Sequence, residues 1–121
     1  MYKILLIEDD PQHIMLVKIR LRSEGYEVAA AQTGAEGVAA ARKQAPDLIL
    51  MDLILPDMGP VELIAALRKI PAAVKTPLIA FTALDSYEIH RRSLDAEIAG
   101  LIPKPYETTE LLGTINRFIK N

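Results

Sequence analysis

Short apolar segments alternate along the chain with longer segments in which apolar residues recur every three or four positions. Short apolar runs are typical of buried strands, and the wider spacing is typical of helices with one buried face. Regular alternation of the two predicts an α/β domain whose parallel sheet is covered by helices. The expected strands are Ile4–Ile7, Glu27–Ala30, Leu48–Met51, Pro77–Phe81 and Ala99–Ile102.

The first two helices begin at recognisable capping sequences. Asp10 followed by Pro11 predicts an N-cap with proline at the first helical position, and Gly25 is placed to end that helix. Thr33 and Glu36 have the spacing of a capping box, which predicts the start of an alanine-rich second helix. The local sequence therefore defines where both helices start.

The last three helices are marked less evenly. Gly59-Pro60 predicts the start of the third, and a weaker, mostly charged fourth helix is expected over Ser86–Ala96. Apolar spacing also predicts a fifth helix near the end of the chain. The residues expected on the buried faces of helices one, three and five are Ile14, Val17, Leu21, Leu63, Ile64, Leu67, Ile70, Leu111, Leu112, Ile115 and Phe118.

Size and composition limit the possible functions. The chain has 121 residues, of which 50% are hydrophobic and 25% charged, as in a globular protein with one domain. Its formal net charge of −2 gives no electrostatic argument for binding nucleic acid or a membrane surface. Without cysteine there is no disulfide framework, zinc–thiolate site or thiol nucleophile, which fits a reducing cytosol.

Polar residues follow the apolar strands where the chain should reach one edge of the sheet. Asp52 comes directly after the third strand, and Glu8 and Asp9 come directly after the first. Thr82 follows the fourth strand, and Lys104 lies just beyond the fifth. Right-handed crossovers bring the carboxyl ends of parallel strands to one edge, where open α/β sheets bind ligands. We therefore expect three acids, a hydroxyl and an ammonium group to converge there.

Such a set of side chains suggests a particular chemistry. Carboxylates this close raise each other's pKa unless a cation joins them, and Mg²⁺ suits one or two carboxylates together with waters and phosphate. Lys104 would attract an incoming anion, and Thr82 would donate a hydrogen bond to it. Together these groups predict phosphoryl transfer to a carboxylate.

The chain closely resembles the receiver domain of bacterial response regulators over essentially its whole length. The resemblance rests on four segments in order and at the family's spacing, namely Ile7-Glu8-Asp9-Asp10-Pro11, Asp52-Leu53-Ile54-Leu55-Pro56, Phe81-Thr82-Ala83 and Lys104-Pro105-Tyr106. It implies a single doubly wound, flavodoxin-like domain over residues 1–121, with five helices and the strand order 2-1-3-4-5. It also implies a signalling domain that promotes only its own phosphorylation and dephosphorylation, and not an enzyme acting on other substrates.

The resemblance assigns a role to each matching position. Asp52 becomes the phosphoacceptor. Asp9, Asp52 and the backbone carbonyl of Ile54 would bind Mg²⁺ directly, and Glu8 would act mainly through metal-bound water.

Three further positions would contact the phosphoryl group. Lys104 would pair with it, and the peptide bond between Lys104 and Pro105 is expected to be cis. The hydroxyl of Thr82 and the backbone N–H of Ala83 would bind the phosphoryl oxygens after transfer.

The implied phosphodonor is a histidine sensor kinase or a histidine phosphotransfer protein, and the output partner is unknown. Phosphorylation would change the surface of the fourth helix, fifth strand and fifth helix, where Thr82, Leu101, His90 and Arg91 are expected. No direct contact with nucleic acid or a membrane is expected, and the expected location is the cytoplasm. The sequence leaves open whether the domain acts alone or belongs to a longer regulator or hybrid kinase.

The chain departs from the family at several positions near the expected site. Leu101 stands where the family has its switch aromatic, so a ring coupled to Thr82 is missing from the output route. Ile54 and Leu84 are apolar and cannot hydrogen-bond an attacking water, from which we expect the acyl phosphate to decay slowly. The loop after Asp52 also differs from the residues that the family often has, at Leu55, Gly59 and Pro60.

Two alternatives from other classes stay open. One is an unphosphorylated pseudo-receiver that acts only as a protein-interaction module, since Leu101 weakens the usual switch. The other is a metal-dependent phosphohydrolase or a flavin-binding protein on a similar fold. Ile54 stands where an aspartyl-phosphate phosphatase would have a second acid, and three acids after the first strand would repel a flavin phosphate.

Some polar residues have simpler explanations. Asp52 alone would suit a cap of the following turn. For His13 and His90, solvated positions on helices are the simplest expectation, since neither lies in an obvious four-helix phosphotransfer context. Tyr106 is expected to pack over the fifth helix.

Overall fold

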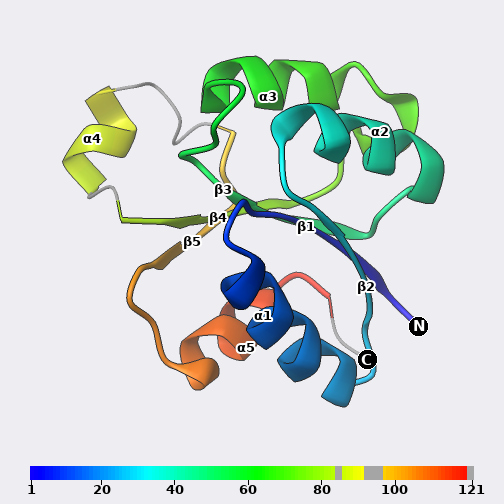
Figure 1. Cartoon of the computed structure of the whole chain (residues 1–121), viewed down its shortest axis with the longest axis vertical. Coiled ribbons are helices and arrows are strands. Elements are labelled where there is room, and N and C mark those ends of the chain that lie inside the picture. Colours follow the sequence, from blue (N-terminus) through cyan, green and yellow to red (C-terminus); the bar gives the residue numbers. More distant parts are fainter. Residues whose placement is uncertain (84–85, 92–96, 120–121) are drawn as a thin grey trace.

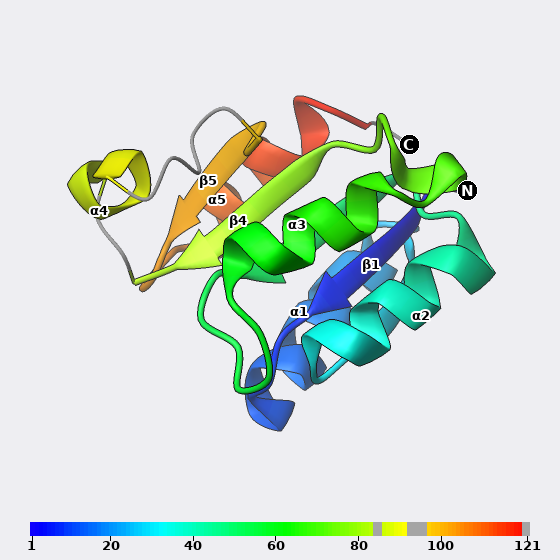
Figure 2. The same cartoon turned by 90° about the horizontal axis from the view of Figure 1, so that it is seen from above.

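A computed structural model describes residues 1–83, 86–91 and 97–119, with the backbone alone at residues 86, 87 and 91. Five parallel strands form one sheet in the order β2-β1-β3-β4-β5. The arrows of β1, β4 and β5 point the same way in Figure 2. The strands are β1 (Lys3–Ile7), β2 (Glu27–Ala31), β3 (Leu48–Asp52), β4 (Leu78–Thr82) and β5 (Gly100–Pro103).

Helices cover both faces of the sheet, as Figure 1 shows. α1 and α5 lie on one face, and α2 and α3 lie on the other. This arrangement confirms the predicted doubly wound α/β fold with the strand order implied by the resemblance. The helices are α1 (Pro11–Ser23), α2 (Gly34–Gln44), α3 (Pro60–Arg68), α4 (Ser86–Arg91) and α5 (Thr108–Asn116).

The central strand β3 shows why its sequence is apolar throughout. Leu48 and Leu50 belong to the core cluster under α1 and α5, whereas Ile49 and Met51 belong to the cluster under α2 and α3. All four side chains are fully buried, and burying each contributes about 1.5–3 kcal/mol. The next residue in this alternation is Asp52, which therefore faces the α1–α5 side.

The caps of α1 and α2 match the sequence in part. The Asp10 carboxylate accepts a hydrogen bond from the backbone N–H of Gln12 at 3.0 Å, which confirms Asp10 as the N-cap. The Thr33 hydroxyl accepts from the N–H of Glu36 at 3.1 Å. The Glu36 carboxylate accepts from the N–H of Gln32 at 3.0 Å and not from Thr33, so only half of the predicted capping box forms.

Two expectations about the later helices need correction or lie outside the description. α5 ends at Asn116, so Phe118 falls beyond the helix and is 36% exposed, while Ile119 is buried. The fourth helix is described only to Arg91, and the expected continuation to residue 96, together with Leu84, lies outside the described residues. In the described part of the chain, no helix combines the length and apolarity that a membrane span requires.

Candidate functional site

The strand ends bring the predicted acids together. Glu8, Asp9 and Asp52 each offer a carboxylate oxygen, and these atoms lie within 4.8 Å of one another. Glu8 is 1% exposed and Asp52 is 8% exposed, whereas Asp9 is exposed. Asp52 is the last residue of β3, so this strand is one residue longer than the predicted Leu48–Met51. A solvent-facing acid above two buried ones leaves room for an ion to approach from solution.

Lys104 joins the two buried carboxylates. Its Nζ donates to Glu8 Oε1 at 2.8 Å and to Asp52 Oδ2 at 2.7 Å. The backbone N–H of Lys104 is fixed in turn by the carbonyl of Thr82 at 2.9 Å, and the following peptide bond to Pro105 is cis, as predicted. The ammonium group therefore compensates the two charges that burial would otherwise disfavour.

The pKa values of these groups separate the two acids. Burial would raise the pKa of Glu8, but the hydrogen bonds from His13 and Lys104 outweigh it and hold that pKa well below its usual range. Burial prevails at Asp52 and raises its pKa, although Lys104 and the N–H of Ile54 donate to it. Burial would lower the pKa of Lys104, but its two carboxylate partners raise it. The fold thus stabilises the charge of Asp52 less than that of Glu8.

Asp52 also caps the turn that follows it. Its Oδ1 accepts the backbone N–H of Ile54 at 2.9 Å, so the simpler explanation of this residue is present beside the functional one. The Ile54 side chain is 55% exposed and is not needed for the core. One Asp52 oxygen is thus held by the turn and the other by Lys104, which fixes the carboxylate's orientation.

The remaining predicted site residues lie on β4, β5 and α4 or directly after β4. Thr82 ends β4 fully buried, and Ala83 follows it at the surface. Leu101 is partly buried against the α2–α3 core cluster. His90 is exposed, as expected, and lines with Leu101 a groove of about 630 Å³. Arg91 ends α4, with its backbone alone described.

His13 contradicts the expectation of a solvated helix histidine. Only 14% of its side chain is exposed; Nδ1 hydrogen-bonds to Glu8, and Nε2 hydrogen-bonds to the hydroxyl of Tyr106. A clue was present in the sequence, because His13 lies four residues before the buried Val17 and thus on the same side of α1. Tyr106 packs on the core cluster that includes α5, but its hydroxyl reaches toward α1.

Asp57, in the loop after β3, is another contact that the sequence did not predict. Its carboxylate accepts from the backbone N–H groups of Gly34 at 2.8 Å and Ala35 at 3.0 Å, at the start of α2, and these bonds lower its pKa. Met58 packs so close to Gly34 that a Cβ there would lie 2.5 Å from the Met58 Cγ. The loop after the candidate nucleophile is therefore tied to α2.

The donor set fits a hard divalent cation. Glu8, Asp9 and Asp52 offer carboxylate oxygens, the ligand atoms that Mg²⁺ prefers, and one of the three faces solvent. Lys104 already shows that the two buried acids bind a positive group at this place. The site is therefore suited to a metal ion and a second, anionic ligand that Lys104 would share.

Comparisons with known proteins agree on one family. A sequence model described as the response regulator receiver domain matches residues 4–116. The transcriptional regulatory protein KdpE of Mycobacterium tuberculosis is 31% identical over 117 residues, which are 97% of this chain and 50% of KdpE. The DNA-binding regulator RpaA of Synechocystis sp. is 32% identical over 120 residues, or 99% of this chain and 50% of RpaA. The chain thus spans about half the length of these relatives.

Solved structures show the same likeness. The chemotaxis response regulator CheY4 of Vibrio cholerae has a TM-score of 0.90 and 30% identity, with 98% of this chain and 99% of that chain covered. The receiver domain of sensor histidine kinase PA1611 from Pseudomonas aeruginosa has a TM-score of 0.88 and 31% identity, with 97% and 96% covered. That structure holds a magnesium ion coordinated in its active site cleft.

Proposed function

The chain belongs to the response regulator receiver family of two-component signalling, and from this premise we propose that Asp52 accepts a phosphoryl group in a magnesium-dependent transfer. The observation that carries the proposal is the bridge of Lys104 between Asp52 and Glu8 beside Asp9. It supports a nucleophilic carboxylate, an acidic metal site and an anion-binding ammonium group in one place.

Mg²⁺ would offset the charge of the acids and of the phosphoryl oxygens. We propose Asp9, Asp52 and the backbone carbonyl of Ile54 as direct ligands, and Glu8 as a ligand of metal-bound water. The acid cluster supports this assignment, and so does the magnesium ion in the related receiver domain of PA1611. The ion is the natural counter-charge for Asp52, whose raised pKa shows that the fold stabilises its charge less than that of Glu8.

In the proposed transfer, an oxygen of Asp52 attacks the phosphorus of a phosphohistidine. The new O–P bond forms as the P–N bond breaks, and the electron pair of that bond stays on the donor's imidazole nitrogen. Lys104 leaves its carboxylate partners to pair with one phosphoryl oxygen. The Thr82 hydroxyl and the Ala83 N–H donate to the remaining phosphoryl oxygens. The product is an acyl phosphate on Asp52.

The family implies a histidine kinase or phosphotransfer protein as donor and a separate output partner, and we propose both classes for this chain. The expected output surface includes the groove that Leu101 and His90 line in the described part of the chain. The pseudo-receiver stays the alternative, because Leu101 replaces the family's switch aromatic. The cytoplasmic location and the domain bounds 1–121 stay predictions from the sequence.

The test is phosphorylation by a small phosphodonor. Wild-type protein incubated with acetyl phosphate and Mg²⁺ should gain the mass of one phosphoryl group, and a chelator should prevent the gain. Asp52→Asn should gain nothing, whereas Asp57→Asn, a matched change in the loop after β3, should be phosphorylated like wild type. An unchanged wild-type mass would favour the pseudo-receiver. Phosphate release without any modification of the protein would favour a phosphohydrolase.

A further inference from the structure

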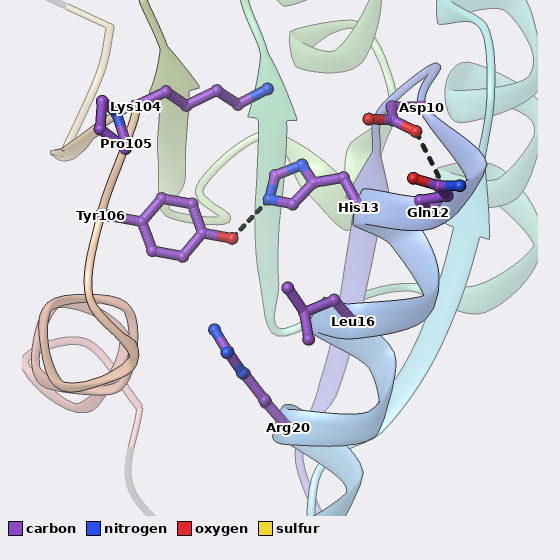
Figure 3. Close-up of a pocket in the computed structure, with 8 residues that line it drawn as sticks. All are labelled: Asp10, Gln12, His13, Leu16, Arg20, Lys104, Pro105 and Tyr106. Carbon is purple, nitrogen blue, oxygen red and sulfur yellow. Dashed lines mark hydrogen bonds between the residues drawn. The ribbon is translucent and has the colours of Figure 1, made fainter.

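His13 lies between the acid site, formed by Glu8, Asp9 and Asp52, and the loop after β5. Figure 3 shows its ring on α1 and the Tyr106 hydroxyl pointing toward each other across a groove of about 440 Å³. The other ring nitrogen of His13 bonds to Glu8, which is also a partner of Lys104. The imidazole thus joins Glu8, at the end of β1, to the loop after β5, and Tyr106 in that loop is 93 residues from His13 in the sequence.

The direction of these hydrogen bonds follows from the groups involved. The ionised carboxylate of Glu8 only accepts, so Nδ1 of His13 must donate to it. In the neutral ring Nε2 then accepts, and the Tyr106 hydroxyl donates to it. Burial raises the pKa of Tyr106, which keeps the hydroxyl protonated and able to donate. With a neutral ring, the three groups form a directed chain of hydrogen bonds from Tyr106 through His13 to Glu8.

Packing limits the movement of the His13 ring. It meets the Phe81 ring edge-on at 5.1 Å between centroids and lies 5.6 Å from the Tyr106 ring. Phe81 and Tyr106 stack with centroids 5.4 Å apart. Phe81 is the neighbour of Asp52 in the sheet register. The His13 ring therefore contacts Glu8, Phe81 and Tyr106 at once.

The hydrogen-bond partners of Glu8 indicate how His13 would hold this carboxylate during the proposed phosphoryl transfer. Glu8 Oε1 accepts from both Lys104 and His13, and Oε2 accepts the backbone N–H of Asp9 at 2.9 Å. When Lys104 turns to a phosphoryl group, Oε1 loses one donor and His13 is the partner that stays. Without His13, the buried carboxylate would lose its orientation and part of its compensation.

We propose that His13 is a positioning residue that holds Glu8 for metal binding and links the state of the acid site to Tyr106. The inference rests on the proposed function, because Glu8 acts there through metal-bound water and Lys104 moves on phosphorylation. Residues that orient metal ligands from behind typically affect metal affinity by about 10-fold or more. His13 does not touch the reacting atoms.

Two substitutions separate the two halves of this role. In His13→Asn, the side-chain amide nitrogen takes the place of Nδ1 and keeps the bond to Glu8, but the contact to Tyr106 is lost. In His13→Gln, the amide group takes the place of Nε2, which keeps the contact to Tyr106 and loses Glu8. Tyr106→Phe removes only the hydroxyl and keeps the stacked ring. Circular dichroism and thermal unfolding check that each variant is folded.

Two readouts are measured on the whole chain, namely Mg²⁺ affinity by calorimetry and the NMR signal of the Tyr106 ring carbon that bears the hydroxyl. We expect Mg²⁺ binding about tenfold weaker in His13→Gln and within about twofold of wild type in His13→Asn. The Tyr106 signal should respond to Mg²⁺ in wild type and lose that response in both variants. Tyr106→Phe, which keeps the His13–Glu8 bond, should also bind Mg²⁺ within about twofold of wild type and should have no further effect in His13→Asn.

The outcomes distinguish this inference from the proposed function. Equal losses of affinity in the Asn and Gln variants would overturn the inference in favour of a packing role for His13. A Tyr106 signal that ignores Mg²⁺ in wild type would overturn the link to Tyr106. If wild type does not bind Mg²⁺ at all, the proposed function falls and the inference falls with it. Normal Mg²⁺ binding in wild type, unaffected by any of the variants, overturns the inference alone.

Discussion

The two faces of the sheet differ beside the acidic strand ends. On the α1–α5 face, polar side chains extend outward from Glu8 and Asp52, whereas on the α2–α3 face the described residue of β5 is Leu101. Strand alternation directs Asp52 and Glu8 to the first face, where His13 and Tyr106 extend the hydrogen bonding to the loop after β5. On the second face Leu101 packs in an apolar cluster and offers no hydrogen bond.

This difference indicates which face of the sheet should respond to phosphorylation of Asp52. The family's usual route uses an aromatic at the position of Leu101, and a leucine there can respond only through packing. The Tyr106 side instead has a ring stack on Phe81 and a hydrogen bond to His13. We therefore expect the α1–α5 face to respond to the acid site more strongly than the β5 position 101.

Removing the ammonium group of Lys104 should have the largest effect on phosphorylation and stability. Lys104→Met keeps the aliphatic stem and deletes the charge that both buried carboxylates share. We expect phosphorylation by acetyl phosphate to slow about 100-fold and the free energy of unfolding to fall by about 2 kcal/mol at pH 7. Lys43→Met, at an exposed position of α2, is the control for loss of a positive charge. Phosphorylation at the wild-type rate in Lys104→Met would show that the ammonium group is dispensable.

The lifetime of the proposed acyl phosphate would set how long either face stays in its phosphorylated state. Ile54 is 55% exposed next to Asp52, and its side chain cannot bind an attacking water. Ile54→Asn should speed the loss of phosphate about tenfold by orienting that water, with little change in stability. Ile54→Val serves as the apolar control. The hypothesis of a slow intrinsic decay is wrong if wild type already releases phosphate as fast as Ile54→Asn.

A smaller effect on stability should follow from the raised pKa of Asp52. Because the folded protein holds this pKa above its usual value of 3.8, the ionised carboxylate costs stability at neutral pH. Asp52→Asn should raise the free energy of unfolding at pH 7, by an amount in the ordinary range of stabilising substitutions, ~0.5–2 kcal/mol. The difference from wild type should vanish as the pH falls below 3.8, where both folded and unfolded wild type are protonated. A difference that persists there would assign the gain to something other than charge.

Added Mg²⁺ gives an independent check of the same group. It should stabilise wild type by mass action and leave Asp52→Asn much less affected, so that their stabilities approach each other. Parallel stabilisation of both proteins would place the ion elsewhere.

The smallest effect is expected at Leu101. Leu101→Val trims one methylene from the α2–α3 cluster, which should cost at most about 1 kcal/mol. Phosphorylation and the response of Tyr106 should stay within about twofold of wild type. A large loss of the Tyr106 response would mean that the two faces are coupled through β5, so that Leu101 would also influence the α1–α5 face.

The fold was predictable because its determinants are local. Apolar runs marked all five strands within one or two residues, and Asp10 marked the start of α1 as observed. The end of α5 was not marked, because the apolar spacing continues through Phe118 although the helix stops at Asn116. The fold class thus came from periodicity, while the strand order came from the resemblance alone.

The candidate site was predictable only for the residues that lie at the carboxyl ends of strands. Asp52, Glu8 and Lys104 converge as expected, since each lies at the carboxyl end of a strand of the same parallel sheet. The contacts of His13 and of Asp57 depend on segments 93 and 23 residues away, and no local pattern reports such pairs. Helical spacing from Val17 would have placed His13 on the buried side of α1, but its contacts with Glu8 and Tyr106 could be identified only in the structure.

The most direct test compares both faces in one phosphorylated sample. Wild-type protein is labelled at the tyrosine ring carbon that bears the hydroxyl and at the leucine methyl groups. NMR spectra are recorded before and after phosphorylation by acetyl phosphate with Mg²⁺, with the modification verified by mass. The account predicts a clear shift of the Tyr106 signal and a smaller one at Leu101, with the Tyr106 shift lost in His13→Asn although Asp52 is still phosphorylated. An unchanged Tyr106 signal in protein that carries the phosphoryl group would contradict it.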